Sequence, residues 1–162
     1  EAIERVRVGR PEPPADARSE LRVADPIERL ANRFLALCVR FPEQLRPSLE
    51  ALTTDAFPTD AQRRLYSQML LRYTRGEPLP PADGFVERLE LFADREFSEL
   101  STEEVVGEGH RSGQELRRHR IKSDLKEIAQ RMRATGQTGG GATNVSDLER
   151  AHDLTNELST LN

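Results

Sequence analysis

The sequence predicts an all-α fold, in which a compact helical bundle is followed by a long helix and a C-terminal antiparallel helical hairpin. Apolar residues recur at steps of three and four along most of the chain, which is the period of an amphipathic helix. No segment shows the strict alternation of apolar and polar residues that is typical of a half-buried strand. Only 36% of the 162 residues are hydrophobic and 32% are charged, which leaves little apolar material for a wide buried sheet.

The composition argues against several classes of protein. The net charge of -4 opposes a general nucleic-acid binder, whose affinity depends on a basic surface. Cys38 is the single cysteine, so neither an internal disulfide nor a cysteine zinc cluster can form, which is compatible with a cytoplasmic location. No apolar run approaches the roughly 20 residues of a membrane span, and no export signal is visible. The chain begins with Glu1, which suggests a piece of a longer protein.

Residues 1–24 are predicted to form a largely disordered linker, because prolines and charged side chains dominate positions 10–25. A first helix then has a clear start. Asp25 can cap it, Pro26 suits the first helical position, and Glu28 adds negative charge to the first turn. The helix should end near Phe41-Pro42. Its predicted buried stripe is Ile27, Leu30, Ala31, Phe34, Leu35 and Cys38.

Four shorter helices should complete a bundle subdomain over 25–113. We expect them at about 45–52, 59–73, 82–92 and 95–106, with a bend at Pro47, a cap at Thr59 and a proline-rich turn over 76–81. The glycines of 107–113 are expected to form a loop that leads into the long helix. The side chains expected in the core of these helices are Leu65, Met69, Leu70, Phe85, Leu89 and Phe92.

A long helix over about 115–133 and a second one over about 145–161 flank a glycine-rich break at 136–141 and form the hairpin subdomain, 114–162. Ser146 and Glu149 match a capping box for the second arm. The predicted seam residues are Leu116, Ile121, Leu125, Ile128 and Met132 on the first arm, and Val145, Leu148, Ala151, Leu154, Leu158 and Leu161 on the second. Because two helices bury only one seam between them, the hairpin needs a further surface, which favours docking over chemistry.

The sequence carries no recognisable catalytic motif. The glycines at 139–141 are followed by Ala142 and Thr143, where a phosphate-binding loop would need a lysine. The three histidines are scattered and lack the spacing of metal ligands. Cys38 lies on the apolar stripe of the first helix, which is typical of a small core residue. We therefore expect no catalytic, metal or cofactor site.

The basic run Arg117-Arg118-His119-Arg120, followed by Lys122, is the best candidate for nucleic-acid contact. Acidic residues stand four positions away in the pairs Arg120–Asp124 and Glu127–Arg131, which can neutralise the run. No aromatic residue accompanies it to stack on a base. A solvated helix face, or contact with an acidic partner, is therefore the favoured interpretation.

Four segments follow one another in a characteristic order: DPIERLANRFLALCVRFPEQL at 25–45, FPTDAQRRLYSQMLLRY at 57–73, LRRHRIKSDLKEIAQRM at 116–132 and LERAHDLTNELSTL at 148–161. The first closes in an aromatic-Pro-Glu step, the second carries Arg-x-Leu-Tyr, and the last two suit the arms of the hairpin. In this order the chain resembles the C-terminal helicase-binding domain of bacterial DNA primase (DnaG). The resemblance covers about 25–162, with a looser fit over 93–113.

The resemblance implies a bundle that stimulates the hexameric replicative helicase (DnaB) and a hairpin that attaches to the N-terminal collar of that helicase. The zinc-binding and polymerase domains of a primase would lie upstream, so the resemblance implies no enzymatic activity for this chain. The partner-binding residues that it suggests are Leu148, His152, Leu154, Thr155, Leu158, Leu161 and Arg131.

Two alternatives stay open. The N-terminal domain of the helicase has a similar bundle and hairpin, but it is expected near the start of a protein, ahead of an ATPase domain. Here a proline-rich linker precedes the bundle and the chain ends at Leu161-Asn162, an order that favours primase. A nucleic-acid-binding helical module is the second alternative, and it would need the basic run to outweigh the net negative charge.

Overall fold

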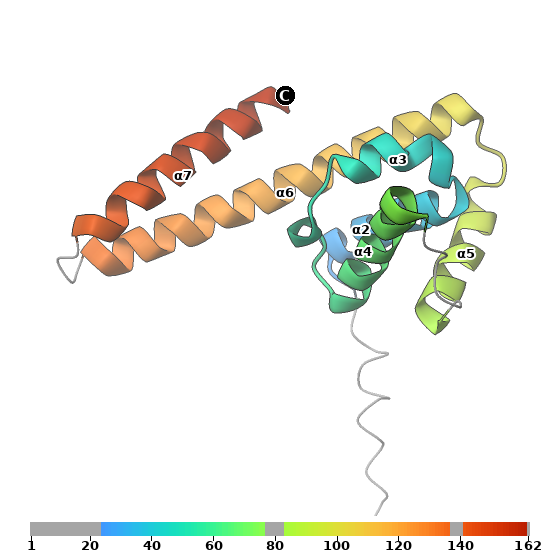
Figure 1. Ribbon diagram of the computed structural model, residues 1–162, viewed down its shortest axis with the longest axis horizontal. Coiled ribbons are helices and arrows are strands. Elements are labelled where there is room, and N and C mark those ends of the chain that lie inside the picture. The colour runs from blue at the N-terminus through green and yellow to red at the C-terminus, as the bar shows by residue number, and fades with distance from the viewer. Residues whose placement is uncertain (1–23, 77–82, 137–140, 162) are drawn as a thin grey trace, which may run out of the picture.

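The computed structural model describes residues 24–76, 83–136 and 141–161, and this part of the chain is helical without any strand (Figure 1). The prediction of an all-α fold is therefore confirmed. The expected linker, the proline-rich turn and the centre of the glycine break fall almost wholly outside the described residues. The elements are α2 (Pro26–Arg40), α3 (Pro42–Glu50), the short 3-10 helix η1 (Thr54–Ala56), α4 (Asp60–Arg75), α5 (Gly84–Phe97), α6 (Thr102–Gly136) and α7 (Gly141–Thr160).

Helix α2 is the centre of the bundle, and its ends are those that the sequence predicts. A carboxylate oxygen of Asp25 accepts a hydrogen bond from the backbone N–H of Ile27 at 3.1 Å, and Pro26 follows as the first helical residue. Helix α3 begins directly at Pro42, three residues before the predicted start, and it continues through Pro47. The buried side chains of α2 are Ala31, Phe34, Leu35, Ala36, Leu37 and Cys38.

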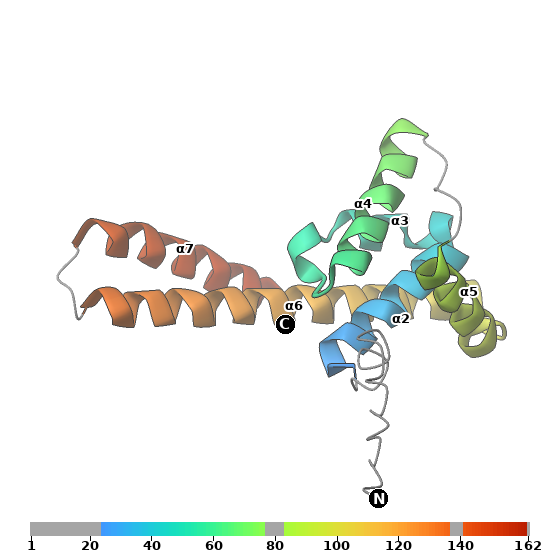
Figure 2. The same cartoon turned by 90° about the horizontal axis from the view of Figure 1, so that it is seen from below.

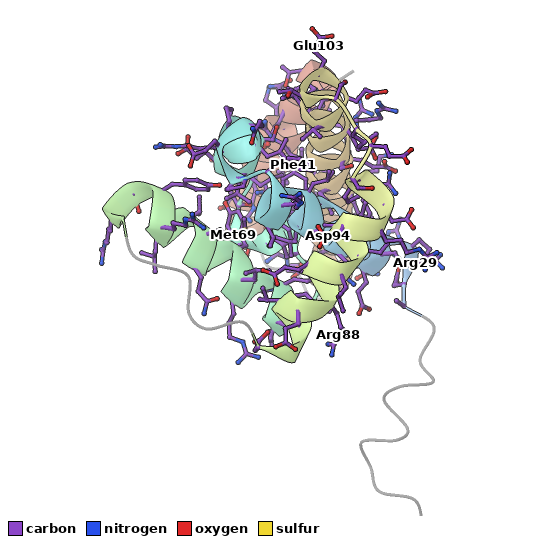
Figure 3. The ribbon with its side chains drawn as sticks, turned by 90° about the vertical axis from the view of Figure 1, so that its right-hand side faces the viewer. Arg29, Phe41, Met69, Arg88, Asp94 and Glu103 are labelled. Atoms are coloured by element: carbon purple, nitrogen blue, oxygen red, sulfur yellow. The ribbon has the colours of Figure 1, made fainter. Side chains whose placement is uncertain are left out.

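Helix α4 begins with the predicted cap at Thr59, which forms a full capping box with Gln62. Its tyrosines tie it to the preceding segment, because the hydroxyl of Tyr66 donates to the carbonyl of Leu52 and that of Tyr73 donates to the carbonyl of Pro42. Figure 3 shows the side chains of this bundle end-on, with Met69 among the helices. The bundle is therefore fixed by polar as well as apolar contacts.

The predicted boundary between the fourth and fifth helices is wrong. Helix α5 continues to Phe97, and α6 then runs without interruption from Thr102 to Gly136, so the loop predicted over 107–113 does not form. Two of its glycines are buried contact points. A Cβ atom on Gly109 would lie 2.3 Å from Cδ2 of Leu45, and one on Gly113 would lie 3.4 Å from the ring of Phe34. Gly109 therefore lies where α6 approaches α3 too closely for a side chain, whereas the contact at Gly113 would be an ordinary van der Waals contact.

Helix α6 belongs to two hydrophobic cores, and Figures 1 and 2 show it running from the bundle out to the hairpin tip. Its N-terminal half packs on α2 and α3, and Leu116 is the last α6 residue in the bundle core. From Ile121 onward α6 packs against α7, with Ile121, Leu125, Ile128 and Met132 facing Ala151, Leu154, Leu158 and Leu161. The expected boundary between subdomains at 113/114 thus falls inside one continuous helix.

Three expectations for side chains are corrected. Val145 and Leu148 do not face α6; they are 58% and 54% exposed. Leu148 lies six residues before Leu154, about 240° around the helix, so the two cannot share one narrow seam. Ser146 cannot form the predicted cap, because α7 already begins at Gly141. Phe92, expected in the core, is 38% exposed, whereas Leu89 is buried as expected.

Candidate interaction surface

The described residues carry no cluster of side chains typical of a metal centre. No group of three or more His, Cys, Asp or Glu side chains in this part of the chain is placed to hold a metal ion. Cys38 is buried in the bundle core, as predicted, and burial raises the pKa of its thiol, so the thiol stays protonated. The histidines 110, 119 and 152 are all exposed and come from separate places on α6 and α7.

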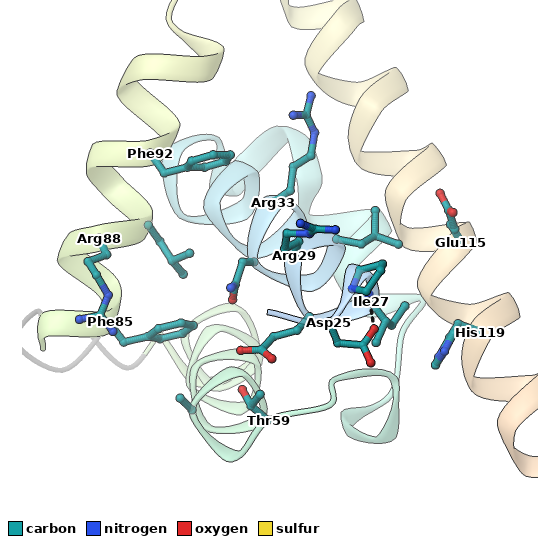
Figure 4. Close-up of a pocket in the computed structure, with 16 residues that line it drawn as sticks. Asp25, Ile27, Arg29, Arg33, Thr59, Phe85, Arg88, Phe92, Glu115 and His119 are labelled. Carbon is teal, nitrogen blue, oxygen red and sulfur yellow. Dashed lines mark hydrogen bonds between the residues drawn. The ribbon is translucent and has the colours of Figure 1, made fainter. Parts of the chain in front are cut away.

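An open hollow of about 1050 Å³ lies between α2, α5 and α6 (Figure 4). Arginines 29, 33 and 88 stand around it, and Arg33 also binds Glu108 at 2.9 Å and stacks on Phe97. Glu115 and His119 border the hollow from α6, and no hydrogen bond joins them in the described chain. The apolar residues that line it are Ile27, Leu30, Phe85, Leu89 and Phe92. The lining therefore combines apolar side chains with charged ones.

The structure divides the seven predicted partner-binding residues into two groups. Leu154 and Leu161 are buried against α6, and Leu158 is partly buried there, so these three side chains hold the hairpin together. Arg131 forms an ion pair with Asp147 of α7 at 3.3 Å, in place of the predicted pair with Glu127. Leu148, His152 and Thr155 are exposed.

Five of the exposed residues of α7 form one stripe along the helix, and the exposed residues Glu149 and Asp153 lie beside it. Val145, Leu148, His152, Thr155 and Ser159 follow one another at steps of three, four, three and four, which places them on one side of the helix. We call this set the α7 outer face. It carries no carboxylate, lysine or arginine, in a chain of which 32% is charged, and two exposed aliphatic side chains lie at its loop end. Sequence reasoning missed Val145 because it assigned this residue to the seam.

The basic run of α6 is occupied by contacts within the fold. Nε of Arg117 donates to a carboxylate oxygen of Glu157 at 2.7 Å, and Arg118 donates to the carbonyl of Leu161. Arg120 donates to the hydroxyl of Thr53 at 2.8 Å and also lies 3.7 Å from Asp124, as predicted. Of the four basic residues at 117–120, only His119 makes no such contact in the described chain.

No protein-family model, curated protein or solved structure significantly matches this chain. Within the described residues, the search for a helix with the length and apolar character of a membrane span is negative.

Proposed function

We propose that this chain is the helicase-binding domain of a bacterial DNA primase and that it docks on the N-terminal collar of a hexameric replicative helicase through the α7 outer face. The proposal rests on the ordered segments that resemble this family and on one structural observation. That observation is the exposure of Val145 and Leu148 side by side on α7, within a stripe of five residues that carries no charged side chain.

The exposed pair supports docking because aliphatic side chains gain free energy when they leave water. Covering one leucine contributes roughly 1.5–3 kcal/mol, and charged residues are depleted at the centres of protein interfaces. The seam residues of the hairpin are already covered by α6, so the outer face is the part of α7 that a partner can still bury. Leu148, His152 and Thr155 stay the predicted contact residues, and Val145 joins them.

The bundle has a different role in this proposal: it stimulates the helicase once the hairpin has docked. The chain itself performs no primer synthesis. A nucleic-acid-binding module is less well supported, because Arg117, Arg118 and Arg120 contact groups within the fold. Free guanidinium groups would be needed to neutralise phosphates.

A pair of matched substitutions tests the docking face. Leu148→Asp places a charge on the α7 outer face, and Leu91→Asp makes the same change at a residue of α5 that is 71% exposed. Neither side chain is in a core, so both variants should keep the circular dichroism of the parent. Calorimetric titration against the replicative helicase encoded in the same genome should show that Leu148→Asp weakens binding about tenfold or more, whereas Leu91→Asp leaves it unchanged.

Other outcomes decide between the alternatives. Absence of binding by the unaltered chain would refute the primase proposal. Loss of binding in Leu91→Asp but not in Leu148→Asp would move the docking surface to the bundle. Assembly of the chain into rings, measured by sedimentation velocity, would favour the N-terminal domain of the helicase.

A further inference from the structure

Three arginines occupy the part of α6 that lies between the two hydrophobic cores. Leu116 is the last α6 residue in the bundle core and Ile121 is the first in the hairpin core. Arg117, Arg118 and Arg120 therefore lie at the boundary between the two cores. No apolar side chain of α6 bridges the two cores between these positions. The boundary is therefore held by the polar contacts that the arginines make.

Glu157 of α7 is the acceptor that two of these arginines share. Its carboxylate lies 2.7 Å from Nε of Arg117 and 3.9 Å from Nη2 of Arg120. The side chains of Arg117 and Glu157 are 37% and 28% exposed, so dissolved ions can still reach this contact. Charge-assisted hydrogen bonds of this kind are the stronger ones in proteins.

The same arginines reach the end of α7 and the bundle. Arg118 donates to the carbonyl of Leu161, where a cation also compensates the negative end of the helix dipole. Arg120 donates to Thr53, which precedes η1 in the bundle. The C-terminal end of α7 is thus linked to the bundle through guanidinium groups.

Apolar packing at this junction is thin. Two small cavities, of about 90 and 60 Å³, lie between the bundle and the hairpin, and Leu52 and Arg117 line both of them. Nε of Arg118 and Nε of Arg120 are buried without a hydrogen-bond acceptor. Since buried donors without acceptors cost free energy, the junction is a weakly stabilised part of the fold.

We propose that Arg117, Arg118, Arg120 and Glu157 form an ionic clamp that positions the C-terminal half of α7 on α6 and against the bundle. The clamp closes at low ionic strength and opens when salt screens its charges. Glu157 is its central positioning residue, because it alone contacts two arginines of the clamp. This inference concerns the conformation of the chain and does not depend on the identity of a partner.

Hydrogen exchange of the amides in 150–161 tests the clamp in the full chain. Glu157→Gln removes the shared carboxylate, and Glu149→Gln makes the same change of charge at an exposed position of α7 that has no ion pair in the described chain. At about 50 mM salt, Glu157→Gln should exchange about tenfold faster than the parent over 150–161, as expected when a charge-assisted hydrogen bond is lost. Glu149→Gln should match the parent.

The salt dependence of hydrogen exchange distinguishes an ionic role of Glu157 from a role in packing alone, because packing would not respond to salt. In the parent, exchange over 150–161 should accelerate toward that of Glu157→Gln at about 1 M salt, where charges are screened within about 3 Å. The exchange of Glu157→Gln itself should respond little to salt. Equal exchange in the two glutamine variants, or exchange in the parent that is independent of salt, would overturn the proposal. The measurement on the parent remains decisive if Glu157→Gln fails to fold.

Discussion

Gly109 of α6 lies against Leu45 of α3 so closely that no side chain can stand between them: a Cβ atom on Gly109 would be 2.3 Å from Cδ2 of Leu45. Leu45 is itself fully buried, so it has little room to move away. Gly107, two residues earlier on the same helix, is exposed, and a Cβ atom added there would have open space around it. Substitution by alanine should therefore change the stability of the protein in opposite directions at these two glycines.

Gly109→Ala should destabilise the protein. Overpacking of a core costs about 1–3 kcal/mol, and the gain in helix propensity, about 1 kcal/mol, offsets only part of that cost. Gly107→Ala gains the propensity without the clash, so it should stabilise the protein by up to about 1 kcal/mol. Urea unfolding followed by circular dichroism measures both changes. A stabilising Gly109→Ala would mean that α6 does not approach α3 as described.

Gln62→Ala should remove a hydrogen-bond junction between α2 and α4. The buried Gln62 amide accepts from the backbone N–H of Thr59 at 3.1 Å and donates to Oδ1 of Asn32 at 2.8 Å and to the carbonyl of Glu28 at 3.1 Å. Its loss opens the capping box and removes three hydrogen bonds of part-buried groups, at a cost of about 2 kcal/mol. Gln68→Ala, on the same helix but without a described hydrogen bond, should stay within about 0.5 kcal/mol of the parent. Equal effects on the free energy of unfolding would contradict this account.

The two tyrosines should make the protein unstable in alkali. Burial raises the pKa of Tyr66, and burial, helped by the nearby Cys38 and Glu43, raises the pKa of Tyr73 to about 12. Because these pKa values exceed the value of about 10 for an unfolded chain, folding favours the protonated phenols. The stability that they contribute is complete below pH 10 and is lost as the pH rises toward 12.

Tyrosinate absorbance measures this directly, since the chain contains two tyrosines and no tryptophan. In the folded protein the absorbance should rise only above pH 10, together with loss of helical circular dichroism. Tyr73→Phe should leave a single titration, that of Tyr66, which is still raised. Titration of both residues near pH 10 while the helices persist would show that the phenols are not held in the interior.

Local signals were sufficient to predict the start and end of α2 and the start of α4. Asp25, Pro26 and Thr59 stabilise the ends of the helices that they begin, so the sequence next to each helix is enough to predict where it starts. The start of α6 could not be predicted in this way. Gly109 and Gly113 have the sequence signature of a loop, but Gly109 lies against Leu45, which is more than sixty residues away in the chain.

The candidate site likewise depends on contacts that local sequence patterns do not predict. The periodicity of α7 is visible in the sequence, but the face that turns to α6 depends on where the helix packs, so Val145 and Leu148 were assigned to the wrong side. The partner of Arg117 is Glu157, forty residues later, and no local pairing rule selects it.

The continuity of α6 has a mechanical consequence. A helix of 35 residues is roughly 52 Å long, and here one end is embedded in the bundle while the other carries α7. No described residue between the two cores leaves the helical conformation, so no hinge separates them. A partner that binds the hairpin tip would therefore act on one end of an uninterrupted helix, and the other end of this helix packs on α2 and α3. Rotation of α6 about its own axis would move Gly109 against Leu45, where no space remains for a further atom.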